Sequence, residues 1–152
     1  MHAPGAGGSV GRVSDTAKSA TAQNKELVLE FWAAAQPDKI PFLAADAVWH
    51  LPTSVARRGF PAQDLQGEQV HALFLGATEV YRPDRTWDID HVIAEDDLVT
   101  LHCTMHAFTT AGNEYHGSYH MLFRVADGQI AEAWEFLDTA YVFECMIPSQ
   151  EG

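Results

Sequence analysis

The stretch that decides the fold runs from Leu98 to Asp138 and reads LVTLHCTMHAFTTAGNEYHGSYHMLFRVADGQIAEAWEFLD. Apolar residues alternate with polar ones along much of it, and this period of two is typical of β-strands that bury one face. Two turn signals interrupt the alternation, Thr110–Asn113 and Asp127-Gly128. The stretch is therefore predicted to form an antiparallel meander of three strands, Leu98–Phe108, Tyr115–Val125 and Ile130–Asp138.

The first predicted strand has two chemically different faces, because successive side chains of a strand point to opposite sides. One face carries Val99, Leu101, Cys103 and Met105, and the other carries Thr100, His102, Thr104 and His106. The two sides of the sheet are therefore expected to meet different surroundings. A meander of this length needs other elements to cover its apolar face, and the rest of the chain can supply them.

The remaining segments are predicted to add helices and two further strands, read from apolar stripes and from proline breaks. In chain order they are a helix over Asn24–Gln36, a short helical turn near Pro41, a strand over Ala47–Leu51, a helix over Glu68–Val80 and a strand over Thr86–Ala94. The irregular stretch Thr53–Gln66 is long enough to be a lid or binding loop. This order predicts an α+β domain, with a curved sheet wrapped on its helices.

The ends of the chain differ in composition from its centre. The first 22 residues are rich in Gly, Ala, Ser and Thr and lack the apolar core of a signal peptide. We expect residues 1–22 to be a disordered tail, residues 23–147 to form a single domain and residues 148–152 to be a C-terminal tail. With 152 residues, 47% of them hydrophobic, the chain can build one sizeable core.

The composition excludes several classes of partner. Nine Lys and Arg against 21 Asp and Glu give a net charge of −12, which repels the phosphates of nucleic acids and of anionic membranes. No run approaches the roughly 20 apolar residues of a membrane-spanning helix. Cys103 and Cys145 are too few for a disulfide framework, so we expect a cytoplasmic protein in a reducing compartment.

Three stretches carry a resemblance to a known family. They are FLAADAVWHLP at 42–52, GEQV at 67–70 and LFRVADGQIAEAWEFLD at 122–138. On these residues the chain resembles the SnoaL-like and ketosteroid-isomerase-like branch of the nuclear transport factor 2-like superfamily. The likeness is specific for the fold and unspecific for the activity, because this superfold hosts isomerases, cyclases, dehydratases, epoxide hydrolases and non-catalytic binders.

The resemblance implies an α+β fold in which a cone-shaped, curved, mixed β-sheet wraps around the N-terminal helices, as in cystatin-like α+β barrels. It also implies a deep, mostly apolar pocket on the concave face, and a homodimer formed through the outer face of the sheet. The expected partner is a hydrophobic small molecule. No cofactor and no metal are expected.

The resemblance singles out Glu135 as a candidate catalytic residue, because related cyclases and epoxide hydrolases carry a pocket carboxylate at this position. A carboxyl group in an apolar pocket has a raised pKa, which suits it to act as general acid or base near neutral pH. The competing interpretation is structural. In it, Glu135 is exposed or is paired with a cation such as Arg124.

Strand pairing adds histidines to this candidate site. A two-residue second turn would place Glu135 opposite His120, and a first hairpin centred on Ala111 would place His120 opposite His102 and His106 opposite His116. We therefore predict that His102, His120 and Glu135 form a row across three strands. A carboxylate beside imidazoles can transfer protons. Metal binding is the alternative function of these paired histidines.

Two arguments about the faces of the sheet disagree. The resemblance puts Glu135, and with it the histidine row, in the pocket. Apolarity alone would bury the opposite face, to which Tyr119 belongs. Both can hold if a dimer partner covers that second face. If the apolar face lines the pocket instead, Tyr119 supplies its hydroxyl and the histidines belong to an interface.

The other polar residues are interpreted from their places in the predicted elements. His71 flanks the apolar stripe of its helix and is expected at the mouth of the pocket, whereas His50 and His91 are expected to be structural. The Arg57-Arg58 pair is expected in a solvated loop, with a clamp for a substrate carboxylate or enolate as the alternative.

Two mechanisms found among the resembled enzymes fit this sequence poorly. The isomerase's general-base Asp would fall on Leu51, and its hydrogen-bond-donating Asp would fall near His120 or Met121. The partner arginine and carboxylate of the epoxide hydrolases would fall near His102 and Thr104, and neither matches.

The sequence therefore predicts a cofactor-independent enzyme that isomerises, cyclises or dehydrates a hydrophobic, polycyclic or terpenoid-like molecule. Glu135 would be the acid or base, with His120 and His102 as its relay or hydrogen-bond partners and His71 at the mouth. The first alternative is a non-catalytic ligand-binding or dimeric assembly module, and the second is an epoxide-hydrolase-like enzyme.

Overall fold

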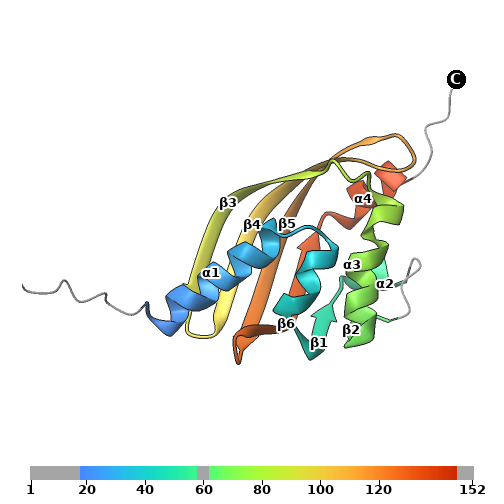
Figure 1. Cartoon of the computed structure of the whole chain (residues 1–152). Helices are drawn as coiled ribbons and strands as arrows, with labels where there is room; N and C mark the ends of the chain where they lie inside the picture. Colours follow the sequence, from blue (N-terminus) through green and yellow to red (C-terminus); the bar gives the residue numbers. More distant parts are fainter. Residues whose placement is uncertain (1–17, 58–61, 147–152) are drawn as a thin grey trace, which may run out of the picture.

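The computed structural model describes residues 18–57 and 62–146, except the side chains of Ala77 and Thr78. Its strands form one curved, mixed sheet of six strands in the order β2-β1-β6-β5-β4-β3 (Figure 1). The strands are β1 (Leu43–His50), β2 (Asp64–Gln66), β3 (Thr86–Glu95), β4 (Leu98–Phe108), β5 (Glu114–Ala126) and β6 (Gln129–Leu137). Only β1 and β6 pair in parallel. The predicted α+β class is confirmed, but β2 and β3 are sheet edges, so the sheet is not closed into a barrel.

The helices cover the concave side of this sheet (Figure 1). They are α1 (Ala20–Ala33), the 3₁₀ helix η1 (Pro37–Phe42), the short α2 (Thr53–Ala56), α3 (Glu68–Val80) and α4 (Thr139–Met146). Helix α1 packs against β3 and β4, α3 against β1, and α4 against the first residues of β5. None of the helices in the described ranges is long and apolar enough to cross a membrane.

The meander has the predicted strands and turns. Asp127 and Gly128 both have positive φ, 52° and 73°, as the two central residues of a type I′ hairpin turn require. The β4–β5 register is also as predicted, with His102 opposite His120 and His106 opposite His116.

Two β-bulges change which side chains face the helices. On β3 the register shifts between Ile89 and His91, so Ile93 turns outward and is 65% exposed, whereas we predicted it on the same face as Trp87. On β6 the extra residue is Ala131, because Val125 pairs with Ile130 and Arg124 pairs with Glu132. A bulge inserts one unpaired residue and so reverses the parity of all residues beyond it.

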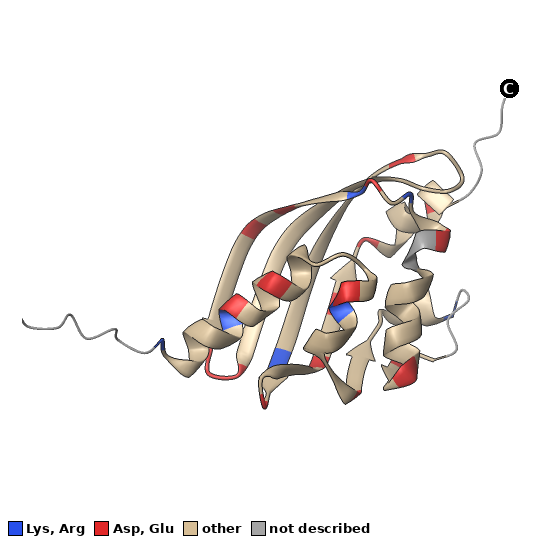
Figure 2. Ribbon diagram, in the orientation of Figure 1, with Lys and Arg blue, Asp and Glu red and all other residues tan. Residues whose placement is uncertain are grey.

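Charged side chains are spread over the outside of the molecule. Figure 2 shows Asp and Glu on the helices, along β3 and in the turns, with Lys and Arg scattered singly among them. Among the Lys and Arg of the described residues, Lys39 is buried, and its Nζ donates a hydrogen bond of 2.9 Å to the carbonyl oxygen of Trp32 at the end of α1. Burial, and then the charge of Arg85, lower the pKa of Lys39 to about 8.

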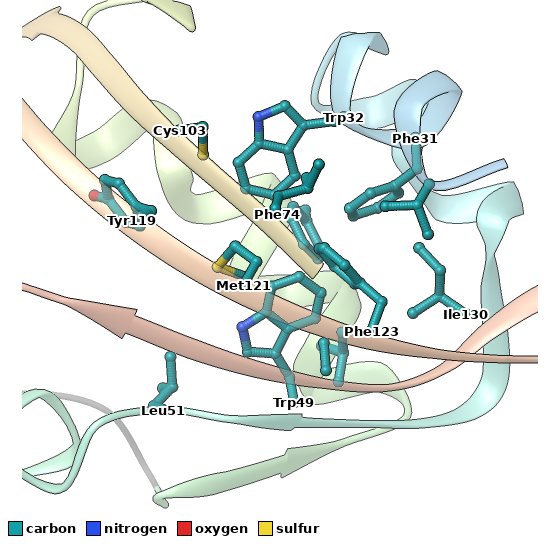
Figure 3. Packing of buried hydrophobic residues seen from close by; sticks show 14 of the residues in the cluster. Phe31, Trp32, Trp49, Leu51, Phe74, Cys103, Tyr119, Met121, Phe123 and Ile130 are labelled. Atoms are coloured by element: carbon teal, nitrogen blue, oxygen red, sulfur yellow. The ribbon is translucent and has the colours of Figure 1, made fainter. Parts of the chain in front are cut away.

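The core between helices and sheet is built around aromatic rings (Figure 3). Phe31 is at the centre, with ring centroids of its neighbours 5.6 to 6.3 Å away. These neighbours are Trp32 from α1, Trp49 from β1, Phe74 from α3 and Phe123 from β5. Phe74 and Phe123 meet Phe31 edge to face, and contacts of this kind are favourable beyond the burial of apolar area.

Several predicted boundaries differ from the structure. Helix α1 begins at Ala20, inside the expected tail, because the hydroxyl of Ser19 caps the helix by accepting a bond from the Ala22 amide. The expected loop Thr53–Gln66 contains α2 and β2, and α4 was not predicted. Residues 1–17 and 147–152, which make up most of both expected tails, lie outside the described residues. Cys103 and Cys145 are both buried and free.

Candidate functional site

Glu135 lies on the covered face of β6. Its cross-strand neighbour is Met121, which is 1% exposed. The indole Nε1 of Trp49 on β1 donates a hydrogen bond of 2.8 Å to Oε2 of Glu135. The predicted alternative pairing with Arg124 does not occur, because the guanidinium of Arg124 binds Glu132 on the outer face at 2.8 Å. The parity taken from the resemblance was therefore right for Glu135.

The surroundings of Glu135 favour its neutral form. Burial raises the pKa of its carboxyl above the ordinary value, and the hydrogen bond from Trp49 opposes this rise only in part. The side chain as a whole nevertheless keeps some accessible surface. A carboxyl group with a raised pKa can give up and take back a proton near neutral pH.

Three tyrosine phenols lie within the electrostatic reach of the Glu135 carboxyl. The hydroxyls of Tyr115 and Tyr119 on β5 are hydrogen-bonded at 3.1 Å, and that of Tyr81, at the end of α3, interacts with both. Burial raises the pKa of all three phenols, and the negative charge of Glu135 raises them further. The phenols therefore stay protonated at neutral pH and can donate hydrogen bonds to a bound oxygen atom.

A glycine makes this arrangement of tyrosines possible. Gly117 lies on the covered face of β5 between Tyr115 and Tyr119. The ring and hydroxyl of Tyr115 pass so close to Gly117 that any Cβ at this position would overlap them. Without a side chain at Gly117, the Tyr115 hydroxyl can reach along the strand to Tyr119.

One donor in this region has no partner. Trp32 is 9% exposed, and its Nε1 is buried without a hydrogen bond. Figure 3 shows the indole nitrogens of Trp32 and Trp49 on the same side of the aromatic cluster, the side on which Tyr119 and Cys103 lie. A buried N–H group without a partner costs free energy, so such a donor indicates a position where a bound ligand can supply an acceptor.

The predicted row of His102, His120 and Glu135 is wrong. His120 lies opposite Phe136, not opposite Glu135, because of the bulge at Ala131. Both histidines belong to the exposed outer face, where His102 is 3.4 Å from Asp90 and His120 is 3.1 Å from the hydroxyl of Thr100. The sheet separates them from Glu135.

The other predicted polar residues are placed as follows. His71 on α3 is partly buried, and its Nε2 has no hydrogen-bond partner. His50 is on the outer face, between Asp64 and Glu132 at 2.8 Å each, and its ring stacks on Trp134. Arg57 ends α2, and Arg58 lies outside the described residues.

Sequence reasoning missed most of the site around Glu135. It did not single out Trp32, Trp49, Tyr81 or Tyr115, and it considered Tyr119 only as an alternative. The available signal was Gly117, an isolated glycine inside a strand pattern between two tyrosines, since such a glycine marks a close approach.

Solved structures with the same fold support this architecture. A candidate SnoaL-like polyketide cyclase from Jannaschia sp. CCS1 superimposes with a TM-score of 0.71 at 20% identity, over 85% of this chain and 95% of that one. IdmH, a candidate polyketide cyclase from Streptomyces antibioticus, gives 0.66 at 21% identity, over 82% and 98%. Bal32a, from a soil-derived mobile gene cassette, gives 0.69 at 22% identity, over 84% and 98%.

Comparison with curated proteins gave no match. The family model for the SnoaL-like domain, however, matches residues 26–133, which is more than half of the chain and includes β1, α3 and the strands up to the first half of β6. Together with the six-stranded sheet and its helical cover, this match shows that the chain belongs to the SnoaL-like domain family.

Proposed function

We propose that this protein is an enzyme that transfers protons on a hydrophobic small molecule, with Glu135 as general acid or base. The reaction would be the cyclisation, isomerisation or dehydration of a polycyclic or terpenoid-like compound that carries a carbonyl group. The candidate polyketide cyclases among the structural neighbours favour cyclisation. The chemistry needs only groups that this chain supplies.

The observation that carries the proposal is the setting of the Glu135 carboxyl. The carboxyl lies on the covered face, burial raises its pKa, and it accepts a hydrogen bond from the neutral indole of Trp49. A purely structural carboxylate on a covered face would be expected to have a cationic partner. A carboxyl group left without one keeps a pKa suited to proton exchange near neutral pH.

The surrounding donors suggest how the substrate would be oriented. As base, Glu135 would remove a proton from the carbon next to the carbonyl, and negative charge would develop on the carbonyl oxygen. The protonated phenol of Tyr119 and the unpartnered indole N–H of Trp32 are available to donate hydrogen bonds to that oxygen. Protonated Glu135 would then return the proton to another atom of the substrate.

His71 remains a candidate for a role at the entrance, because its Nε2 lacks a partner. We leave His102 and His120 out of the proton-transfer set, since they belong to the other face of the sheet.

Proton exchange tests the proposal before the substrate is known. Polycyclic ketones and polyketide-like diketones would be incubated with the protein in D₂O, and deuterium uptake next to the carbonyl followed by NMR. We expect uptake with wild-type protein and a loss of at least about 100-fold in Glu135→Gln. Glu132→Gln is the matched control, because this carboxylate lies on the outer face of the same strand.

The non-catalytic alternative gives a different result in the same experiment. A binding module would show ligand-induced shifts of core resonances without deuterium uptake. Uptake that Glu135→Gln leaves unchanged would remove Glu135 from the mechanism.

We also propose that a second copy of this chain covers the part of the outer face of the sheet around Phe136 and Ile93. Phe136 and Ile93 are 57% and 65% exposed there. Large apolar side chains that are exposed together on one face are typical of interfaces. Light scattering should find a dimer that Phe136→Glu converts to monomer. Leu75→Glu on α3, at a side chain that is also 57% exposed, should leave the dimer intact. A monomeric wild-type protein would contradict this proposal.

A further inference from the structure

A second polar cluster lies on the outer face of the sheet and has no role in the function proposed above. His106 on β4 and His116 on β5 are directly opposite each other. Their Nδ1 atoms are 2.9 Å apart, and their rings are nearly perpendicular, with an interplanar angle of 85°. Two imidazoles thus present the same ring nitrogen to each other.

The other nitrogen of each ring is held by a carboxylate. Nε2 of His106 lies 2.9 Å from Oδ2 of Asp88, and Nε2 of His116 lies 2.8 Å from Oε1 of Glu114. An ionised carboxylate only accepts hydrogen bonds, so Nε2 of His106, which is hydrogen-bonded to Asp88, carries a proton and donates it. Nε2 of His116 lies within ion-pair distance of Glu114 and can do the same. Both Nδ1 atoms of the neutral rings are unprotonated in that case, whereas in the other tautomer Nδ1–H of His116 donates to Nδ1 of His106.

The two Nδ1 atoms, 2.9 Å apart, therefore share one proton or, when neither carries one, present two free lone pairs to a cation. A metal ion bound to both at about 2.0 Å would lie beside the line that joins them. A carboxylate that accepts from the second nitrogen of a histidine is the usual support of a metal-binding imidazole, because it fixes the tautomer and increases the basicity of the ligating nitrogen.

The immediate surroundings also attract cations. The two histidines border a crevice that is lined in addition by Asp84 and Glu114. No Lys or Arg is among the described residues that line it. Figure 2 shows further acidic residues along β3, and the net charge of the chain is −12. A cation therefore gains electrostatic free energy by entering this crevice.

We propose that His106 and His116 bind a divalent transition-metal ion through their Nδ1 atoms, with Asp88 and Glu114 as the carboxylates that support them. Copper(II) is the ion that we expect, because nitrogen sites bind it more tightly than the other divalent first-row ions.

The site would be open on its solvent side. No group of three or more His, Cys, Asp or Glu in the described ranges converges on one point, so the protein supplies two ligands and water the others. The bound ion would join β4 to β5 near their shared turn. Once the free concentration of the ion exceeds the dissociation constant, the stabilisation of the folded state would grow with the logarithm of that concentration.

The same strands offer a matched control pair. His102 and His120 are also directly opposite, but their ring centroids are 6.4 Å apart, against 4.9 Å for His106 and His116. Nδ1 of His102 faces Asp90, and Nε2 of His120 contacts Thr100. The ring nitrogens of this pair thus point to other partners and not toward each other. We therefore expect that the pair does not chelate a metal ion.

Copper titration of the full chain tests the proposal. Calorimetry would give stoichiometry and affinity, and electron paramagnetic resonance would count the coordinating nitrogens. The background should be His2→Ala, because this further histidine lies outside the described residues and can itself bind copper. We expect one equivalent of Cu²⁺ with two imidazole nitrogens, and at least tenfold weaker binding in His106→Ala and in His116→Ala. Double substitution of His102 and His120 by Ala should change the affinity less than twofold.

Each other outcome overturns the proposal. Equal losses in both histidine pairs, or several weak equivalents that no variant changes, would mean an adventitious ion only. Absence of binding would mean that the two histidines share a proton instead. All four side chains are at least partly exposed, so their substitution should leave the fold intact, and circular dichroism would verify this.

Discussion

Trp49 and Glu135 are joined by a hydrogen bond of 2.8 Å that links two parallel neighbours of the sheet, β1 and β6. The residues are far apart in sequence, and the indole is almost fully buried. The bond stabilises the ionised carboxylate, whereas burial stabilises the neutral acid. The protonation of Glu135 is therefore set by two opposing effects, and one of them can be removed by a single substitution.

Trp49→Phe should raise the pKa of Glu135 further, because it deletes the donor and leaves the desolvation. Carbon-13 NMR titration of the Glu135 carboxyl would measure the change. The pH profile of any exchange activity that needs ionised Glu135 should move its acidic limb to higher pH. The smaller ring should also lower the free energy of unfolding, by about 1 to 3 kcal/mol.

The control for this experiment is Trp134→Phe, which removes an indole from the outer face of β6. This substitution should leave the pKa of the Glu135 carboxyl unchanged. An unchanged pKa in Trp49→Phe would mean that the bond does not form in solution.

Glu135→Gln should stabilise the protein at neutral pH. Because the folded state raises the pKa of Glu135, it binds the proton more tightly than the unfolded chain does. The resulting stability is complete below the unfolded pKa, near 4.5, and is lost as the pH rises through the higher folded value. Glutamine carries no charge at any pH and can still accept from Trp49, so it avoids this loss.

Thermal unfolding at pH 4.5 and at pH 8 measures the effect. The melting temperature of Glu135→Gln should exceed that of the wild type at pH 8, and the difference should shrink or disappear at pH 4.5. A variant that is less stable at pH 8 would show that the ionised carboxylate is well solvated or paired.

Gly117→Ala should disrupt the tyrosine network. The new methyl group would overlap the buried ring and hydroxyl of Tyr115, and overpacking of this kind costs about 1 to 3 kcal/mol. Because ring carbons of Tyr115 lie almost as close to the new methyl position as the hydroxyl oxygen does, the cost should be smaller in a Tyr115→Ala background, which a double-mutant cycle would reveal. Chemical denaturation measures the free energy of unfolding of each variant in the cycle.

Gly76→Ala is the matched control for this substitution. Nothing lies within 4 Å of the position that its methyl group would take, and the residue is inside α3. Alanine is the better helix former by about 1 kcal/mol, so this variant should be stabilised. If both alanines lower stability equally, the close packing at Gly117 is not the cause.

The sequence predicted the meander well and the site poorly, and the β-bulges are the main reason. Alternation and turn residues were enough to place the β4–β5 hairpin in its register, down to the pair His102 and His120. A bulge at Ala131 has no signature in the sequence, yet it moves Glu135 from the face of His120 to the face of Met121. The apolar pattern was right about the covered face of β5, and the resemblance was right about that of β6. The two arguments disagreed only because this single residue reverses the parity between the strands.

Long-range contacts were the other limit. Trp49 meets Glu135 only because β1 inserts beside β6 in parallel, and no local pattern specifies which strand becomes that neighbour. The unpartnered nitrogen of Trp32 likewise depends on how α1 lies across the sheet. The period of the hydrophobic pattern and the residues at the turns determine the helices, strands and hairpins. The contacts between distant elements follow from packing.

His50 should make the stability depend on pH in the opposite sense to a buried neutral histidine. Burial alone would lower its pKa, but hydrogen bonds to Glu132 and Asp64 and the charges of both carboxylates outweigh this and raise it. The stability from these ion pairs is then complete below the unfolded pKa of about 6.5 and is lost as the pH rises through the folded value. His50→Gln should therefore lower the free energy of unfolding by up to about 1 kcal/mol at pH 5.5 and by less at pH 9. Denaturation at both pH values measures this, and an equal loss at the two would show that His50 contributes by stacking on Trp134 rather than by its charge.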